Sequence, residues 1–171
     1  MNQPLNNKML VALDGSEAAL RAVHHVANVA CGCRGFELTL LHVVGIPPSV
    51  LHHEGSEVAS TMPRPEQELE EKTHAWLERE KQRAEREVFA PAKEALRSGT
   101  AAEGKPRIQI KELAEAHPDV ASAILEEARR GNYGIVVLDR RGRSYLKEFM
   151  FGSVTWKVIH HLQGRTVWVV G

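Results

Sequence analysis

The stretch Gly134–Ser153, which reads GIVVLDRRGRSYLKEFMFGS, decides how this chain folds. Its first part, Ile135–Leu138, is a short continuous apolar run, which is typical of a strand buried on both faces of a parallel sheet. Gly142 follows, and after nine more residues come Gly152 and Ser153. Glycine has no Cβ, so the backbone at these positions can approach a ligand closely. The stretch therefore predicts a buried strand, a glycine-containing loop and the start of a helix.

The end of this stretch has the features of an anion site. Ser153 is suited to cap the helix that follows, and a helix N-terminus offers backbone N–H groups and a positive dipole end to a phosphate. The loop is also locally basic, because Arg140, Arg141, Arg143 and Lys147 outnumber Asp139 and Glu148. An ordinary strand–loop–helix junction can have the same spacing, so phosphate binding and a purely structural turn both stay open on these residues.

The composition suits one globular domain. The chain has 171 residues, of which 43% are hydrophobic, and its 22 basic residues balance 22 acidic ones. A net charge of zero does not favour nucleic acid or an acidic membrane as a partner. No apolar run approaches the ~20 residues that span a bilayer. Residues 1–8 lack the apolar core of a signal peptide, so we expect a cytoplasmic protein.

Strand-like and helix-like segments alternate along the chain. Apolar runs predict strands at Met9–Leu13, Phe36–Val44, Lys105–Leu113, Ile135–Leu138 and Thr166–Val170. Apolar residues at helical spacing predict helices at Glu17–Ala30, Glu66–Arg97, Asp119–Arg130 and Ser153–Leu162. Pro91 should kink or split the second helix. This order indicates an α/β fold with a parallel sheet covered on both faces, and residues 1–171 form one domain with a long loop at 45–65.

Ligands bind such sheets beyond the carboxyl ends of the strands, where the strand order reverses. Asp14 follows the first predicted strand, and Leu138 and Asp139 end the fourth, so these ends face each other across a crevice if the two strands are neighbours. Asp14 could then accept a hydrogen bond from a ribose hydroxyl or an adenine amine, or it could simply cap the following helix. Val43 could offer its backbone to an adenine edge, or it could be a core residue.

Two segments at opposite ends of the chain resemble the universal stress protein family. Met9–Val26 resembles the family's opening, which is a strand, then Asp-Gly-Ser-Glu, then a helix. Leu138–Val158 resembles its nucleotide loop, Gly-x₂-Gly-x₉-Gly-Ser/Thr, with Gly142, Gly152 and Ser153 in register. The resemblance covers nearly the whole chain. It implies an open five-stranded parallel sheet in the order 3-2-1-4-5, with helices on both faces, which is a Rossmann-like three-layer sandwich. It also implies that ATP is a candidate ligand, because some members of the family bind ATP and others do not.

The resemblance also implies which residues hold an adenine nucleotide. Asp14 and Val43 should contact the adenosine part, while Gly142, Gly152 and Ser153 should hold the phosphates, within reach of Arg141. The complete predicted set is Ala12, Asp14, Ser16, Val43, Leu138, Asp139, Arg141, Gly142, Gly152, Ser153 and Val154.

Asp139 departs from the family's loop, in which its position is a glycine. A carboxylate there repels a triphosphate, by ~4 kcal/mol for unit charges ~4 Å apart at an effective dielectric of about 20. The neighbouring arginines can offset this repulsion, and Asp139 could instead help to hold Mg²⁺. Two functions stay open: a regulatory module that binds ATP or a related adenine nucleotide in response to stress or energy status, and a nucleotide-free homodimeric interaction protein.

No catalytic or metal site is predicted. The only two cysteines, Cys31 and Cys33, are expected to be reduced thiols, because no second cysteine pair completes a metal site. Adjacent residues on a helix point in different directions, so His24-His25 and His160-His161 should each comprise one packed and one exposed residue. No nucleophile with a poised general base can be identified, which indicates a non-enzyme or at most a slow ATPase.

The last predicted strand, Thr166–Val170, reads TVWVV and lies at a sheet edge in the implied order. An apolar edge strand can pair with another chain. The resemblance implies a two-fold homodimer through this strand.

Overall fold

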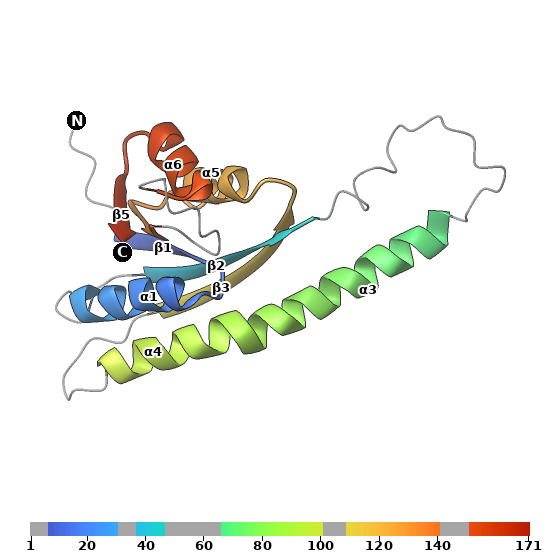
Figure 1. The fold of residues 1–171 in the computed structure, drawn as a ribbon, viewed down its shortest axis with the longest axis horizontal. Coiled ribbons are helices and arrows are strands. Elements are labelled where there is room, and N and C mark those ends of the chain that lie inside the picture. The colour runs from blue at the N-terminus through green and yellow to red at the C-terminus, as the bar shows by residue number, and fades with distance from the viewer. Residues whose placement is uncertain (1–6, 31–36, 47–65, 101–108, 141–150) are drawn as a thin grey trace.

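The computed structural model of the chain describes residues 7–30, 37–46, 66–100, 109–140 and 151–171 (Figure 1). Its strands are β1 (Lys8–Leu13), β2 (Glu37–Gly45), β3 (Gln109–His117), β4 (Ile135–Asp139) and β5 (Thr166–Val170). Its helices are α1 (Glu17–Ala30), α3 (Glu66–Ala84), α4 (Ala90–Thr100), α5 (Val120–Arg130) and α6 (Ser153–His161). The strands form one parallel sheet in the order β3-β2-β1-β4-β5, which confirms the predicted fold class.

Strand β1 lies at the centre of the sheet because it is apolar on both faces. Met9, Leu10 and Val11 are fully buried. Val11 pairs with Leu40 of β2 on one side and with Val137 of β4 on the other. The first and fourth strands are therefore neighbours, which is the condition for their carboxyl ends to share a crevice.

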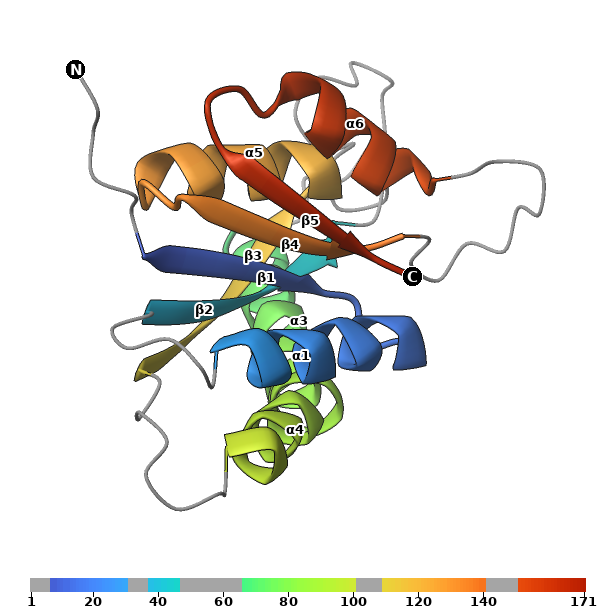
Figure 2. The same ribbon diagram turned by 90° about the vertical axis from the view of Figure 1, so that its left-hand side faces the viewer.

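Helices cover both faces of the sheet (Figure 2), and an apolar core lies on each side of it. Met9 and Val11 pack with α1 and α4 on one face, whereas Leu10 packs with α5 and α6 on the other. This division follows from the alternation of side chains along a strand. The helices α5 and α6 thus lie over the same face as each other, with their first turns at the carboxyl edge of the sheet.

Pro91 neither splits nor ends the long helix, contrary to one of the two predicted outcomes. α3 continues through a π-helical turn, Glu85–Phe89, into α4, and the three segments run on together past the sheet (Figure 1). The Ala90 N–H donates to the Glu85 carbonyl oxygen, five residues back. Proline lacks an N–H and its ring crowds the carbonyl four residues earlier, so a wider turn just before Pro91 accommodates it.

The third strand ends later than the sequence predicts. Residues 105–108 lie outside the described residues, and β3 continues past Leu113 to His117. Ala114, Glu115 and Ala116 have low strand propensity, but they pair in register with His42, Val43 and Val44 of β2. Pairing with a long neighbouring strand overrides the local preference here.

Candidate functional site

A cavity of about 390 Å³ opens at the carboxyl ends of β1 and β4. It is lined by the ends of three strands and by the first turns of two helices. The lining residues are Ala12, Leu13, Asp14, Leu41, Val43, Val120, Ile124, Leu138, Asp139, Gly152, Ser153, Val154 and Thr155. Of the predicted nucleotide-binding residues, all but Ser16, Arg141 and Gly142 therefore meet around one cavity. Arg141 and Gly142 lie outside the described residues.

Asp14 and Ser16 start helix α1. The Ser16 N–H donates to Asp14 Oδ1 (2.9 Å), and the Ala19 N–H donates to Ser16 Oγ (3.1 Å). Gly15 between them has a φ of 78°, which glycine adopts without strain. Ser16 is thus the helix cap, outside the cavity lining. Asp14 both accepts a hydrogen bond in the turn before α1 and lines the cavity. The structural role and the ligand contact, which the sequence left as alternatives for Asp14, are therefore compatible.

The start of α6 forms another wall, and here the predicted cap is wrong. Gly152, with φ −66° and ψ 157°, is the residue that precedes the helix, and no side chain caps it. Ser153 is already the first helical residue, because the Gly152 carbonyl accepts the Trp156 N–H at 2.8 Å. Thr155 Oγ1 donates to the Asp139 carbonyl oxygen (2.8 Å) in the buried interior. This bond fixes the first turn of α6 against the end of β4.

The other end of the cavity is apolar. Val120 and Ile124 of α5 line it together with Val43 and Leu138. The sequence places Val120 and Ile124 only in the buried stripe of a helix and misses their part in the cavity. One signal was available: the helix after β3 must begin at the carboxyl edge of the sheet, so residues four apart in its first turns reach the crevice.

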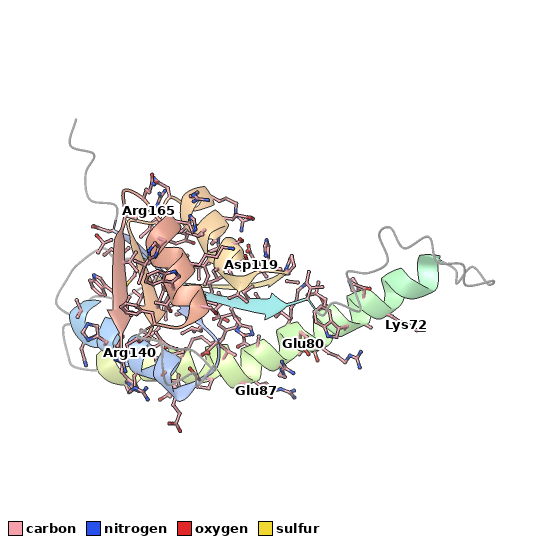
Figure 3. The ribbon with its side chains drawn as sticks, turned by 45° about the horizontal axis from the view of Figure 1, so that its top comes forward. Lys72, Glu80, Glu87, Asp119, Arg140 and Arg165 are labelled. Carbon is pink, nitrogen blue, oxygen red and sulfur yellow. The ribbon has the colours of Figure 1, made fainter. Side chains whose placement is uncertain are left out.

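A charged cluster joins the two helices that flank the cavity. Asp119 Oδ1 accepts the Ala121 N–H (3.1 Å), and Asp119 Oδ2 accepts Ser122 Oγ (2.8 Å) and the ammonium group of Lys157 on α6. Figure 3 shows Asp119 at the start of α5. The hydrogen bonds from Lys157 and then Ser122 lower the pKa of Asp119 to about 2. The cluster joins the first turn of α5 to the second turn of α6.

The charge on the described part of the lining is negative. Asp14 and Asp139 carry carboxylates, and no lysine, arginine or histidine stands among the described lining residues. Asp139 is 8% exposed. Arg140 is exposed and lies near the end of β5 (Figure 3), where a Cβ on Gly171 would come within 3.0 Å of its Nε.

The histidine pairs do not build a metal site in the part of the chain that the structure describes. There, no group of three or more His, Cys, Asp or Glu side chains could hold a metal ion. His24, His25, His160 and His161 are all exposed, so the expectation of one packed residue in each pair is wrong. One member of each pair still contacts an aromatic ring: His25 lies edge-on to Trp168, with ring centroids 6.1 Å apart, and the ring centroid of His160 lies 3.8 Å from that of Trp156. Cys31 and Cys33 lie outside the described residues.

The comparisons with known proteins agree with this fold. The model of the universal stress protein family matches residues 6–171. The chain belongs to this family. A universal stress protein of Bacillus subtilis (strain 168), YxiE, is 31% identical over 153 residues, which are 89% of this chain and 90% of that protein.

Solved structures resemble this universal stress protein over nearly its whole length. The hypothetical protein MJ0577 has a TM-score of 0.71 at 23% identity, covering 97% of this chain and 96% of that one. A universal stress protein in complex with cAMP has a TM-score of 0.57 at 17% identity, covering 97% of each chain. One from Archaeoglobus fulgidus in complex with dAMP has a TM-score of 0.55 at 17% identity, covering 96% and 97%. These identities establish a shared fold.

Proposed function

We propose that this universal stress protein binds ATP or a related adenine nucleotide and acts as a stress- or energy-responsive regulatory module. The observation that carries the proposal is the cavity at the carboxyl ends of β1 and β4, with one apolar end and one end at a helix start. Its volume of about 390 Å³ lies in the range of small-molecule sites. Its place also obeys the general rule for ligands in open α/β sheets.

Each end of the cavity suits one part of a nucleotide. Val43, Val120 and Ile124 offer an apolar slot to a flat adenine ring. Asp14 also lines the cavity, and its carboxylate can accept a hydrogen bond from a ribose hydroxyl. Gly152 lacks a Cβ, and the first-turn N–H groups of α6 after it can hold a phosphate. Arg141 and Gly142, on the loop beyond β4, would complete the phosphate end.

Two further findings support an adenine ligand. One structural neighbour was solved with cAMP and another with dAMP, and both share this fold.

Mg²⁺ could accompany a nucleotide, because it prefers phosphate and carboxylate oxygens and Asp139 lines the cavity near the start of α6. We propose a binding module, not an enzyme, because no described lining residue pairs a nucleophile with a poised base: the Thr155 hydroxyl donates to the Asp139 backbone carbonyl and Asp14 accepts the Ser16 N–H.

A second candidate function is a nucleotide-free homodimeric interaction protein. The observation that favours it is Asp139, a buried carboxylate where the family's loop has glycine.

For either function we propose a homodimer, because β5 is an apolar edge strand that pairs only with β4 among the described strands. None of the described helices is long and apolar enough to cross a membrane.

Isothermal titration with adenosine, AMP, cAMP and ATP, each with and without Mg²⁺, separates the two functions. We expect saturable binding of at least one of these ligands at one site per chain. Gly152→Val should weaken every phosphate-bearing ligand about tenfold or more, because its side chain meets the phosphate, while adenosine changes less. Gly45→Val is the matched control, since a Cβ at Gly45 meets no atom within 4 Å and the residue lies outside the lining. Flat heats with all four ligands would support the interaction protein.

A further inference from the structure

His42 binds the end of β1 from the face of the sheet opposite the cavity. Its Nδ1 lies 2.8 Å from the Leu13 carbonyl oxygen. A carbonyl oxygen only accepts hydrogen bonds, so Nδ1 carries the hydrogen and donates it. Side chains alternate along a strand, so His42 points away from the face of Leu41 and Val43, which line the cavity. His42 therefore acts on the cavity only through the backbone.

The π-helical turn between α3 and α4 holds the His42 ring in place. Phe89, the last residue of that turn, is 3% exposed. Its ring lies 6.4 Å from the His42 ring, centroid to centroid, in a T-shaped arrangement with an interplanar angle of 89°. Phe89 shares its apolar core with Leu40, two residues before His42 on the same face of β2. This packed wall restricts the directions that the half-buried His42 ring can take.

The bond from His42 fixes the peptide that leads into Asp14. A peptide group is planar, so holding the Leu13 carbonyl oxygen also sets the direction in which the chain enters the turn at Asp14. The register of β1 with β2 ends at the pair of Leu13 and His42, so the bond secures the two strands where their pairing stops. It thereby ties the end that carries Asp14 to the end that carries Val43.

We propose that His42 is a positioning residue for the adenosine part of the ligand, because it holds Asp14 and Val43 in their relative places. This inference rests on the proposed function, since it concerns the same cavity. His42 is outside the lining and acts through the Leu13 carbonyl. The phosphates are held elsewhere, at the start of α6. Loss of the His42 bond should therefore weaken adenosine and its phosphates by the same factor.

The test compares His42→Leu with His42→Asn, whose side chains have nearly the same branched shape. Asparagine has an amide N–H donor close to the position of Nδ1, and leucine has no donor. We expect His42→Leu to weaken every adenine ligand that the wild type binds by about fivefold, which corresponds to one hydrogen bond. His42→Asn should stay within about twofold of wild type. Isothermal titration with adenosine, AMP, cAMP and ATP measures the affinities.

Tyr133→Phe is the matched control for a general loss of stability. The Tyr133 hydroxyl binds Thr39 and Glu127, and the residue lies outside the cavity lining. The substitution should therefore destabilise the fold and leave the ends of β1 and β2 in place. We expect its affinities to stay within about twofold of wild type, at a temperature at which circular dichroism shows each variant to be folded.

Each outcome decides between separable statements. If His42→Leu binds as tightly as His42→Asn, or if Tyr133→Phe loses as much affinity as His42→Leu, the inference is overturned and nucleotide binding stands. Unequal losses for adenosine and its phosphates would also overturn it. If the wild type binds none of the four ligands, the proposed function fails and this inference fails with it.

A second variant keeps the test decisive if His42→Leu does not fold. His42→Gln is polar like His42→Asn, but its donor lies one carbon farther out, near the position of Nε2 and away from the Leu13 carbonyl. His42→Gln should then show the fivefold loss relative to His42→Asn. Equal affinities of the two variants would overturn the inference.

Discussion

Tyr133 connects strand β2 to helix α5 through one hydroxyl group. Its oxygen lies 3.0 Å from Thr39 Oγ1 and 3.0 Å from Glu127 Oε1. Glu127 is only 4% exposed, and its other oxygen accepts Arg130 Nε at 2.8 Å. A carboxylate at such a depth is tolerated because both of its oxygens have donors. Burial raises the pKa of Tyr133, so the hydroxyl remains a donor at neutral pH.

Tyr133→Phe should therefore lower the free energy of unfolding by about 1–3 kcal/mol, because it leaves a buried Glu127 oxygen without that donor. Urea denaturation followed by circular dichroism measures the change, which should appear in the midpoint with the slope m unaltered. Trp156→Phe removes the polar group of a 55% exposed side chain and should leave the midpoint nearly unchanged. Equal midpoints for Tyr133→Phe and wild type would contradict the assigned role.

Asp119 gives stability a pH dependence at the acid end. Its pKa is about 2 in the folded protein, against an ordinary value of 3.8. A depressed folded-state pKa adds stability that is complete above the unfolded pKa and is lost as the pH falls through about 2. The side chains of Asp119 and Lys157 are 45% and 41% exposed, so screening by solvent limits the pair to about 0.5–1 kcal/mol.

Asp119→Asn isolates that contribution, since asparagine also caps helices well and only the charge is lost. We expect the variant to be less stable than wild type at neutral pH, with the difference declining below about pH 4 and lost as the pH falls through about 2. Urea midpoints at several pH values measure it. Lys157→Met should show the same pattern, and the double variant should be no worse than either single one. A pH-independent difference would show that the pair carries no such stability.

Among whole elements, α5 depends on a close packing at its end. A Cβ at Gly131 would come within 2.1 Å of the Tyr133 ring, whereas a Cβ at Gly45, at the end of β2, would meet nothing within 4 Å. Gly131→Ala must displace the ring and should cost about 1–3 kcal/mol. Gly45→Ala is the matched substitution and should stay within about 0.5 kcal/mol of wild type. Thermal unfolding compares the two, and similar melting temperatures would contradict the packing argument.

The elements also show how far the sequence predicts the fold. Strands β1 and β4 follow from their apolar runs, because residues buried on both faces leave little ambiguity. The end of β3 does not, since Ala114 and Ala116 pair there only because β2 extends beside them. The π-helical turn follows only in part, because Pro91 predicts a disturbed helix but not that a wider turn absorbs it while Val88 and Phe89 stay buried in the core. Local patterns give neither the pairing at the end of β3 nor this outcome.

The same limit applies to the candidate site. Asp14, Leu138 and Gly152 can be placed from the sequence, because they follow strands or precede a helix at the carboxyl edge of the sheet. Val120 and Ile124 look like ordinary core residues in the helical pattern, since one apolar stripe of α5 serves both the core and the cavity. Only their place in the first turns after β3 marks them as cavity residues. The misplaced cap at Ser153 has a different origin: Gly152 adopts the extended backbone of a cap residue, and no motif distinguishes the two positions.

At the scale of the whole molecule, the open edge of β5 sets the expected assembly. The Thr166 N–H donates to the Gly134 carbonyl (3.0 Å), and the Val170 carbonyl accepts the Arg140 N–H (2.8 Å). Backbone groups alternate in direction along a strand, so those of Thr166 and Val170 face β4 and those of Val167 and Val169 face away from it. The outward groups can pair with the same strand of a second copy across a two-fold axis.

Val169→Pro should therefore abolish the proposed homodimer. Proline removes the outward N–H of Val169 but no hydrogen bond to β4, and edge strands tolerate it. Sedimentation velocity over a range of concentrations should show a dimer for wild type and for the control Val169→Ala, and a folded monomer for Val169→Pro. A monomeric wild type would remove the dimer from the proposal. A dimeric Val169→Pro would assign the contact to another surface, because a strand pairing at this edge needs the amide that the substitution takes away.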